Sequence, residues 1–298
     1  STMWCYYQYN KTSSFGASGG NLMAAKTINF ANFKGGVGKT MTGILTARWF
    51  SKFGFKVLFI DLDPQANATS ILLRSTGIED FERSLYEGIK AGDITNCIVP
   101  TFENLDLIPS DLDLVGLPIF LNDTVKGNIK SRAYLLDHLI EPLRNDYDFI
   151  FIDTPPTISD FTNNAVVAAD YAALVMQTQD WSFKATQQFI PYLQEMIHAY
   201  ETDIDLLGVI PLLIESRSPS DISVFNRAKE EYGEYLMKSA IYHRRRIKTF
   251  TRKGITDNDR HDKDALYMYK RLAKEMLERM GYDGPFGETT SEQDNEGQ

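Results

Sequence analysis

The stretch "ANFKGGVGKTMTG" (residues 31–43) joins a glycine-rich turn to the start of an apolar segment with helical character. It nearly matches the phosphate-binding pattern G-x-x-x-x-G-K-[ST], but Phe33 stands where that pattern has its first glycine. A second lysine, Lys34, follows Phe33, and the ordinary pattern does not require it. The stretch therefore predicts a strand-to-helix turn that binds phosphate, and it leaves the role of Lys34 to be explained.

The glycines matter because backbone N–H groups reach phosphate oxygens only where no side chain blocks their approach. Lys39 would neutralise the outer phosphates, and the hydroxyl of Thr40 would bind Mg²⁺ at the start of a helix whose dipole favours anions. The nucleotide-binding residues predicted from this loop are Lys34, Gly35, Gly36, Val37, Gly38, Lys39, Thr40 and Met41.

Two further segments end an apolar strand in an aspartate: "LFIDLDPQANAT" (58–69) and "DFIFIDTPPT" (148–157). A single aspartate at a strand end is more often a turn or a helix cap. Together with the glycine loop, these two segments make three motifs in an order that favours a magnesium-dependent nucleotide hydrolase. In such enzymes, carboxylates hold Mg²⁺ or position the attacking water. The predicted metal-site residues are Thr40, Asp61, Asp63 and Asp153.

Apolar runs that end in polar turns alternate with helical stretches along most of the 298 residues. This alternation predicts an α/β fold: a mostly parallel, twisted sheet flanked by helices on both faces, with ligands at the carboxyl ends of the strands. We expect no strand beyond Ala240, and we expect Pro191 to interrupt its helix. Strands are expected near 27–32, 56–61, 105–110, 148–156, 171–177 and 204–213, and helices near 40–54, 131–141, 181–200, 219–232 and 264–280.

Composition divides the chain into three parts. Residues 1–22, rich in Ser, Gly and Tyr, are interpreted as a flexible arm or tag, residues 23–282 as a single domain, and residues 283–298 as an acidic disordered tail. The apolar runs are far shorter than the roughly 20 residues of a membrane helix. Two cysteines and the lack of a signal-like segment fit a reducing compartment, so we expect a soluble, cytoplasmic protein.

The formal net charge is −9, yet residues 244–253 contain six Lys or Arg and no acid. A net negative charge argues against a protein that coats nucleic acid with its whole surface, but a local basic patch could still bind it. For an arbitrary basic run, a solvated helix face or pairing with acids elsewhere is an equally good explanation.

The segments "KGGVGKT" (34–40), "VLFIDLDPQANAT" (57–69) and "YDFIFIDTPPT" (147–157) resemble the three nucleotide motifs of the ParA-type DNA partition ATPases, members of the deviant Walker A group. The likeness extends from about Lys26 to Thr256. It implies ATP and Mg²⁺ as cofactors and a homodimer that closes around two nucleotides, with Lys34 reaching the phosphates held by the other subunit. The implied catalytic residues are Lys34, Lys39 and Asp63, of which Asp63 orients the hydrolytic water, while Asp61 and Asp153 belong to the outer shell of the metal.

The resemblance also implies non-specific binding of double-stranded DNA on the nucleoid, and a separate centromere-binding, ParB-like protein that stimulates hydrolysis. Turnover should be slow without that partner, because a site built from positioning alone lacks a strong general base. The loop begins at residue 34, which leaves no room for an N-terminal helix-turn-helix domain and suggests a short form of the family. The residues implied in DNA binding are Lys229, Arg244, Arg245, Arg246, Lys248 and Arg252.

Relatives with the same loop do different work. MinD-like ATPases end in a basic amphipathic helix that lies on the membrane, whereas this chain ends acidic, and an iron–sulfur protein would need more interior cysteines than Cys97. A MinD-like or other nucleotide switch or scaffold that positions a cargo other than DNA remains open. The sequence does not discriminate between plasmid and chromosome as the cargo.

Overall fold

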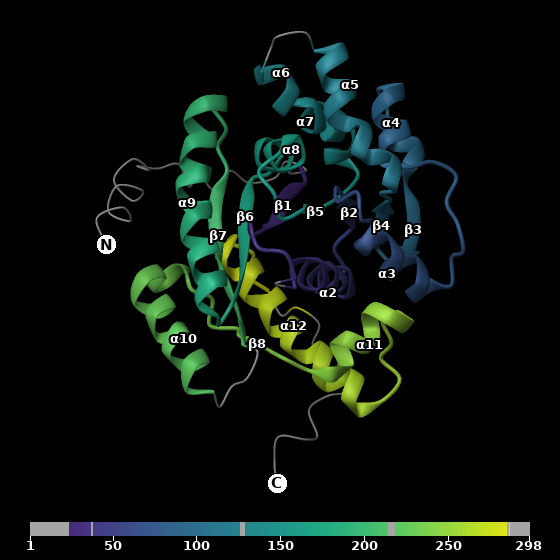
Figure 1. The fold of residues 1–298 in the computed structure, drawn as a ribbon. Coiled ribbons are helices and arrows are strands. Elements are labelled where there is room, and N and C mark those ends of the chain that lie inside the picture. The colour runs from purple at the N-terminus through teal and green to yellow at the C-terminus, as the bar shows by residue number, and fades with distance from the viewer. Residues whose placement is uncertain (1–23, 37, 126–128, 214–217, 285, 287–298) are drawn as a thin grey trace.

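A computed structural model describes residues 24–36, 38–125, 129–213, 218–284 and 286. An eight-stranded sheet with the order β3-β4-β2-β5-β1-β6-β7-β8 runs through its centre (Figure 1). Every neighbouring pair is parallel except β3 and β4, so the predicted mostly parallel α/β fold is confirmed. The strands are β1 (Lys26–Ala31), β2 (Val57–Asp61), β3 (Val99–Phe102), β4 (Leu105–Ile108), β5 (Phe149–Asp153), β6 (Tyr171–Gln177), β7 (Asp205–Leu213) and β8 (Ile241–Tyr242).

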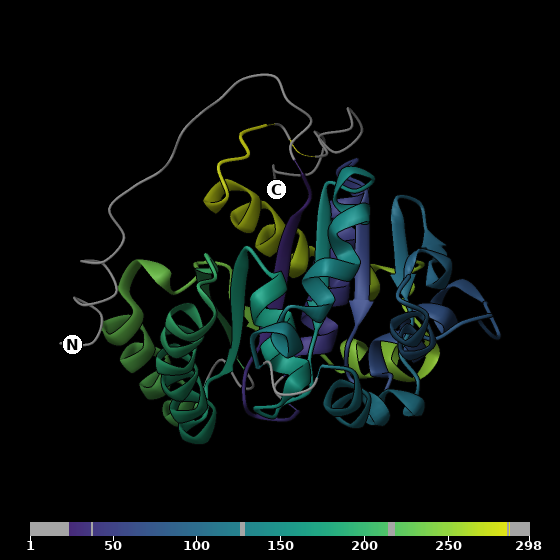
Figure 2. The same ribbon diagram turned by 90° about the horizontal axis from the view of Figure 1, so that it is seen from above.

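Helices cover both faces of this sheet (Figures 1 and 2). One face carries α2 (Lys39–Lys52), α3 (Asn67–Thr76), α11 (Arg245–Lys253) and α12 (Arg260–Arg279). The other face and the β7 side carry α4 (Leu85–Ala91), α5 (Leu117–Thr124), α6 (Ile129–Ala133), α7 (Leu135–Ile140), α8 (Asp160–Ala168), α9 (Asp180–Tyr200) and α10 (Pro219–Tyr232).

Strands β2 and β5 are apolar up to their final aspartates because both of their faces are covered. On the α2 face, the ring of Phe50 lies 4.8 Å from that of Phe149 and 5.1 Å from that of Phe151, centroid to centroid. On the opposite face, Ile150 and Ile152 are fully buried. These contacts fix β5 in the middle of the sheet, and β5 delivers Asp153 to its carboxyl end.

Two predictions about secondary structure are wrong. A short strand, β8, does follow Ala240; its two residues are too few to show a period in the sequence. Pro191 lies inside α9 without ending it. Its neighbours Ile190 and Tyr192 are both buried, and this packing maintains the helix despite the missing backbone N–H.

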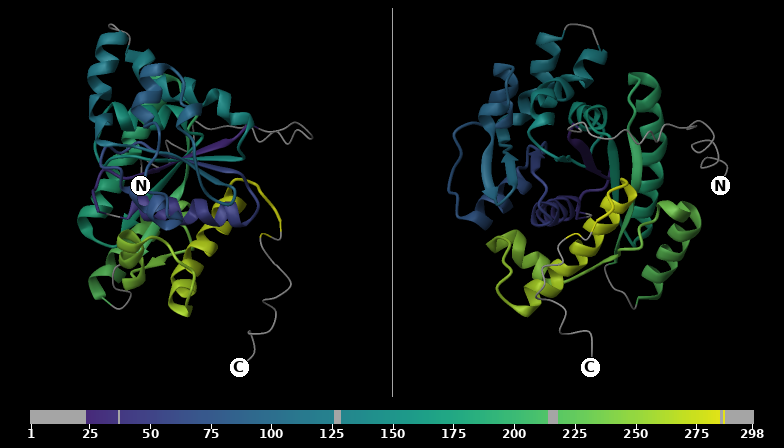
Figure 3. Two further views of the ribbon diagram at one scale, coloured as in Figure 1. Left: turned by 90° about the vertical axis from the view of Figure 1, so that its right-hand side faces the viewer. Right: turned by 180° about the vertical axis from the view of Figure 1, so that it is seen from behind.

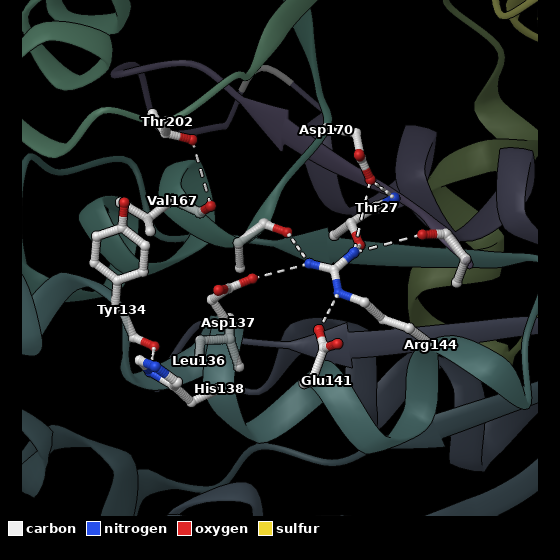
Figure 4. Close-up of polar contacts among 12 residues, drawn as sticks. Thr27, Tyr134, Leu136, Asp137, His138, Glu141, Arg144, Val167, Asp170 and Thr202 are labelled. Atoms are coloured by element: carbon white, nitrogen blue, oxygen red, sulfur yellow. Dashed lines mark hydrogen bonds and ion pairs between the residues drawn. The ribbon is translucent and has the colours of Figure 1, made fainter. Parts of the chain in front are cut away.

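At the amino-terminal edge of the sheet, Arg144 joins several segments (Figure 4). Its guanidinium donates to the Oγ1 of Thr27 at 3.1 Å and to the carboxylate of Asp137 at 2.9 Å, and it lies 3.7 Å from the carboxylate of Asp170. The same carboxylate of Asp170 accepts the backbone N–H of Thr27 at 2.7 Å. Arg144 therefore holds the starts of β1 and β6 together, at the edge opposite to the predicted nucleotide site.

None of the helices in the described part of the chain is long and apolar enough to cross a membrane.

The first described residues lead into β1 in the middle of the sheet, and α12 packs against α2 near the end of the described chain (Figure 3).

Candidate nucleotide site

The three sequence motifs meet at the carboxyl edge of the sheet. Strand β5 lies between β2 and β1, and Asp61 at the end of β2 pairs in register with Asp153 at the end of β5. Phe30 of β1 pairs with Asp153 on the other side, and the glycine loop starts directly after β1. The parallel topology thus brings the glycine loop and Asp61 together with Asp153, which lies far from both in the chain.

The loop between β1 and α2 has the backbone that its glycines predict. Gly36 and Gly38 have φ angles of 73° and 89°, in the left-handed region that favours glycine. A side chain at Gly38 would also stand 3.0 Å from a methyl group of Leu212. Val37, predicted to contact the nucleotide, lies outside the described residues.

Helix α2 begins at Lys39 with no side-chain cap and no acidic residue in its first turn. Its first N–H groups are therefore left without a side-chain acceptor, which suits an anionic ligand at this end. Met41, in the same turn, is only 7% exposed and packs in the core beneath α2. A nucleotide could contact Met41 only through its backbone.

The side chains of Lys39, Thr40 and Asp153 form the centre of the site. The Thr40 hydroxyl donates a hydrogen bond of 2.6 Å to one carboxylate oxygen of Asp153. The other carboxylate oxygen, Oδ1, is buried and has no hydrogen-bond partner among the described residues. Burial lowers the pKa of Lys39, while the negative charges of Asp153 and Asp63 act in the opposite direction.

Asp61 is fully buried and is occupied by its own neighbours. It accepts hydrogen bonds of 2.8 Å from both the backbone N–H and the hydroxyl of Thr69, and one of 3.2 Å from the N–H of Asp63. Burial raises the pKa of Asp61 to about 6, and the hydrogen bonds from Thr69 oppose that shift. The carboxylate of Asp61 therefore holds the turn into α3 and accepts the backbone N–H of Asp63, so its oxygens are already engaged by the protein.

The site fits a divalent cation. Burial, followed by the neighbouring charge of Asp61, raises the pKa of Asp153 to about 8. Such a shift means that the protein alone stabilises this carboxylate poorly in its charged form, and a cation beside the unpartnered Oδ1 would reverse that. No group of three or more His, Cys, Asp or Glu side chains in the described ranges could hold a metal by itself. The donor set thus suits Mg²⁺ held by the Thr40 hydroxyl and by nucleotide phosphates, with carboxylates around it.

Contacts that three residues, Asn32, Gln177 and Trp181, make at the loop were not anticipated from the sequence. The buried amide of Asn32 donates to the carbonyl of Val175 at 2.8 Å and to the Oγ1 of Thr186 at 3.0 Å, and its oxygen accepts the N–H of Lys34 at 2.9 Å. The Gln177 amide donates to the carbonyl of Gly36 at 3.0 Å. Finally, the Lys34 Nζ lies 4.9 Å from the centroid of the Trp181 ring.

Phe33, which stands in place of the expected first glycine, has a packing role. Its ring lies 4.6 Å from that of Phe189 and 5.1 Å from that of Tyr192, both on α9. Phe33 therefore attaches the loop to α9.

The basic residues predicted to bind DNA are separated into three groups. Arg244, Arg245, Lys248 and Arg252 are exposed on and beside α11, and no ion pair to any of them occurs within the described ranges. Arg246, in contrast, is paired with Asp259 and with the buried carboxylate of Asp262. Lys229 lies on α10 and lines a groove with Phe225 and Met237. Helices α10 and α11 lie on opposite sides of α12 (Figure 1).

Comparison with known proteins identifies the family. A family model described as an AAA domain matches residues 25–206. The sporulation initiation inhibitor protein Soj of Bacillus subtilis is 32% identical over 220 residues, which cover 72% of this chain and 83% of Soj. The chromosome partitioning protein ParA of Caulobacter vibrioides is 27% identical over 72% of this chain and 80% of its own length. The chain belongs to the ParA-type partition ATPases of the P-loop class, as its motifs predict.

Solved structures share this fold and contain the ligands predicted for this chain. A plasmid partition protein from Borrelia burgdorferi bound to AMPPNP superimposes with a TM-score of 0.69 at 25% identity, covering 86% of this chain and 98% of that one. Other structures with this fold contain ADP or an ATP analogue together with magnesium. These ligands agree with ATP and Mg²⁺ as the predicted cofactors.

The raised pKa of Asp153 predicts how stability depends on pH without nucleotide. Between about pH 4 and pH 8 the folded protein binds a proton that the unfolded chain releases, so the free energy of unfolding falls as the pH rises through this window. Asp153→Asn removes this dependence. In melting curves from pH 5 to about pH 8.5, the variant should gain stability relative to the wild type as the pH rises, and it should lose the stabilisation by Mg-ATP.

Asp123→Asn is the matched control, because it makes the same substitution at an aspartate that is exposed on α5. A difference between Asp153→Asn and wild type that stays constant with pH would contradict this description of the site.

Proposed function

We propose that this chain binds Mg-ATP in the loop of residues 34–40, closes with a second copy around two nucleotides, and binds double-stranded DNA without sequence preference in that state. The observation that carries the proposal is the contrast between two lysines of one loop. Lys39 is 6% exposed and faces the aspartates, whereas Lys34 is exposed at the rim and has no acidic partner among the described residues. A lysine in this position could contact phosphates that are bound by another subunit.

Electrostatics favours this arrangement. Two triphosphates buried face to face leave a large negative charge, and a lysine donated by each subunit offsets part of that charge for the other. Cations in this position also stabilise the charge that develops in phosphoryl transfer. Lys34 would thus act in trans, and each site would be complete only in the dimer.

Each residue of the site has a distinct proposed task. Lys39 binds the outer phosphates, and Thr40 provides a ligand for Mg²⁺, which would offset phosphate charge when it is bound. Asp63 is assigned the orientation of the hydrolytic water. It is the most exposed of the three aspartates, at 9%, whereas Asp61 and Asp153 are at most 1% exposed. None of these groups is a strong general base, so turnover is slow until a ParB-like, centromere-binding partner completes the site.

The proposed DNA surface is α11. Arg245, Lys248 and Arg252 are spaced three and four residues apart, so they lie on one side of the helix. Arg244 extends this surface and, with Arg245, borders a hollow of about 340 Å³. Contacts to phosphates by such residues give affinity without base recognition, and dimerisation on ATP would double the surface.

Arg246 contributes less to this surface in the present proposal. Its pairing with Asp259 and Asp262 neutralises much of its charge and anchors α11 to the start of α12. Lys229 would be a separate, peripheral contact.

Variants of the nucleotide site separate binding from hydrolysis. Lys39→Ala should weaken nucleotide binding by about 10- to 100-fold, because it removes charge-assisted hydrogen bonds, and it should stay monomeric and off DNA. Asp63→Ala should bind ATP, dimerise and stay on DNA because it cannot hydrolyse. Sedimentation and DNA retention, each with ADP and with ATP, measure both effects. Release of Asp63→Ala from DNA at the wild-type rate would contradict the proposed role of Asp63.

Reversal of the charges on α11 tests the DNA surface. The triple variant Arg245→Glu, Lys248→Glu, Arg252→Glu should bind ATP and dimerise normally. For a duplex of arbitrary sequence, the slope of log affinity against log salt concentration should be smaller in magnitude than that of the wild type by about 3 or more. The reason is that at least three phosphate contacts are lost. Fluorescence anisotropy with AMPPNP at several salt concentrations measures this slope.

The control reverses three exposed charges outside α11, Lys56, Arg83 and Lys90. If the α11 variant keeps wild-type affinity and slope, DNA binds elsewhere, or the dimer is a scaffold for another cargo.

A further inference from the structure

The contact between Lys34 and Trp181 places an aromatic ring beside the lysine that the proposed dimer needs. Trp181 is the second residue of α9 and is 43% exposed, which is unusual for a ring of this size. The Lys34 Nζ is 4.9 Å from the centre of that ring, within the range of a cation–π interaction. No polar contact of the Lys34 ammonium occurs within the described ranges.

The neighbouring acid does not compete for this lysine. Asp180, which precedes Trp181, accepts a contact of 2.5 Å from the guanidinium of Arg227 on α10. That guanidinium also lies 4.7 Å from the centre of the Phe183 ring. The side chain of Asp180 is therefore held on the α10 side of the helix, and the ring of Trp181 is the group that Lys34 contacts.

The backbones of both partners are held in a fixed relation. The N–H of Lys34 is bound by Asn32, whose amide in turn donates to Thr186 on α9, five residues after Trp181. Gln177, at the end of β6, holds the carbonyl of Gly36. Because the loop and the first turns of α9 are joined in this way, the ring stands at a defined place relative to the Lys34 backbone.

We propose that Trp181 is the positioning residue of Lys34, holding its ammonium at the rim of the nucleotide site, charged and directed toward a second copy of this chain. This inference rests on the proposed ATP-dependent dimer and adds to it a residue that acts through Lys34. An acid at the position of Trp181 would neutralise the lysine, whereas an aromatic face confines the ammonium and leaves its charge available. A lysine confined in this way loses less side-chain freedom when it meets a phosphate, so the dimer forms more readily.

The test is a double-mutant cycle on the dimerisation constant, measured by sedimentation with AMPPNP and Mg²⁺ so that hydrolysis does not intervene. Trp181→Ala should weaken the dimer about two- to fivefold, equivalent to about 0.5–1 kcal/mol. Trp181→Phe should recover part of this loss. In the Lys34→Ala background, Trp181→Ala should have no further effect, because Trp181 acts through the lysine. Tyr267→Ala is the control, since Tyr267 is an exposed ring on α12 away from the site.

A second measurement examines the contact in the nucleotide-free protein. Lys34→Ala should change the tryptophan emission of the wild type and should leave that of Trp181→Phe unchanged. Two results overturn the positioning role: an unaltered dimer in Trp181→Ala, or an equal loss with and without Lys34. A wild type that remains monomeric with AMPPNP contradicts the proposed function itself, and the positioning role fails with it.

Discussion

A buried excess of negative charge at the ends of β2 and β5 is the constraint on which the site depends. The register of the two strands sets Asp61 beside Asp153, and the carboxylate of Asp63 lies near Lys39. Lys39 is the cation that the chain itself places among them, and burial makes its charge costly as well. Such a cluster is poorly stabilised without further cations. Magnesium would provide the positive charge that the carboxylates lack, and the phosphates that it accompanies would pair with the buried Lys39.

The residues that flank the glycine loop hold it in place. A loop that must accept a nucleotide needs glycines and therefore has few side chains with which to hold its own position. Here that function is taken by its flanking residues: Phe33 packs on α9, and Asn32 bonds to β6 and α9. Helix α9 consequently carries both the anchor of the loop and the ring that contacts Lys34.

The sequence predicts the parts of this structure that are local or strongly periodic. The fully apolar runs of β2 and β5 identify central strands, and the glycine loop identifies the start of α2. Strand β3 escapes notice because it is a short edge strand with Pro100 inside it, a position that an edge tolerates. Contacts between distant segments are not visible in this way. Nothing in the local sequence indicates that Gln177 would reach Gly36, or that Asp259, 13 residues beyond Arg246, would fold back onto it.

The central claim is that each site takes Lys34 from the opposite subunit, and subunit mixing tests it most directly. Lys34→Ala and Asp63→Ala should each be inactive alone. In a mixed dimer, the site on the Lys34→Ala subunit keeps its own Asp63 and receives Lys34 from its partner. An equal mixture should therefore regain about a quarter of the wild-type ATPase rate, since random pairing makes half of the dimers mixed, each with one intact site. If the mixture stays as inactive as its two components, Lys34 does not act across the dimer.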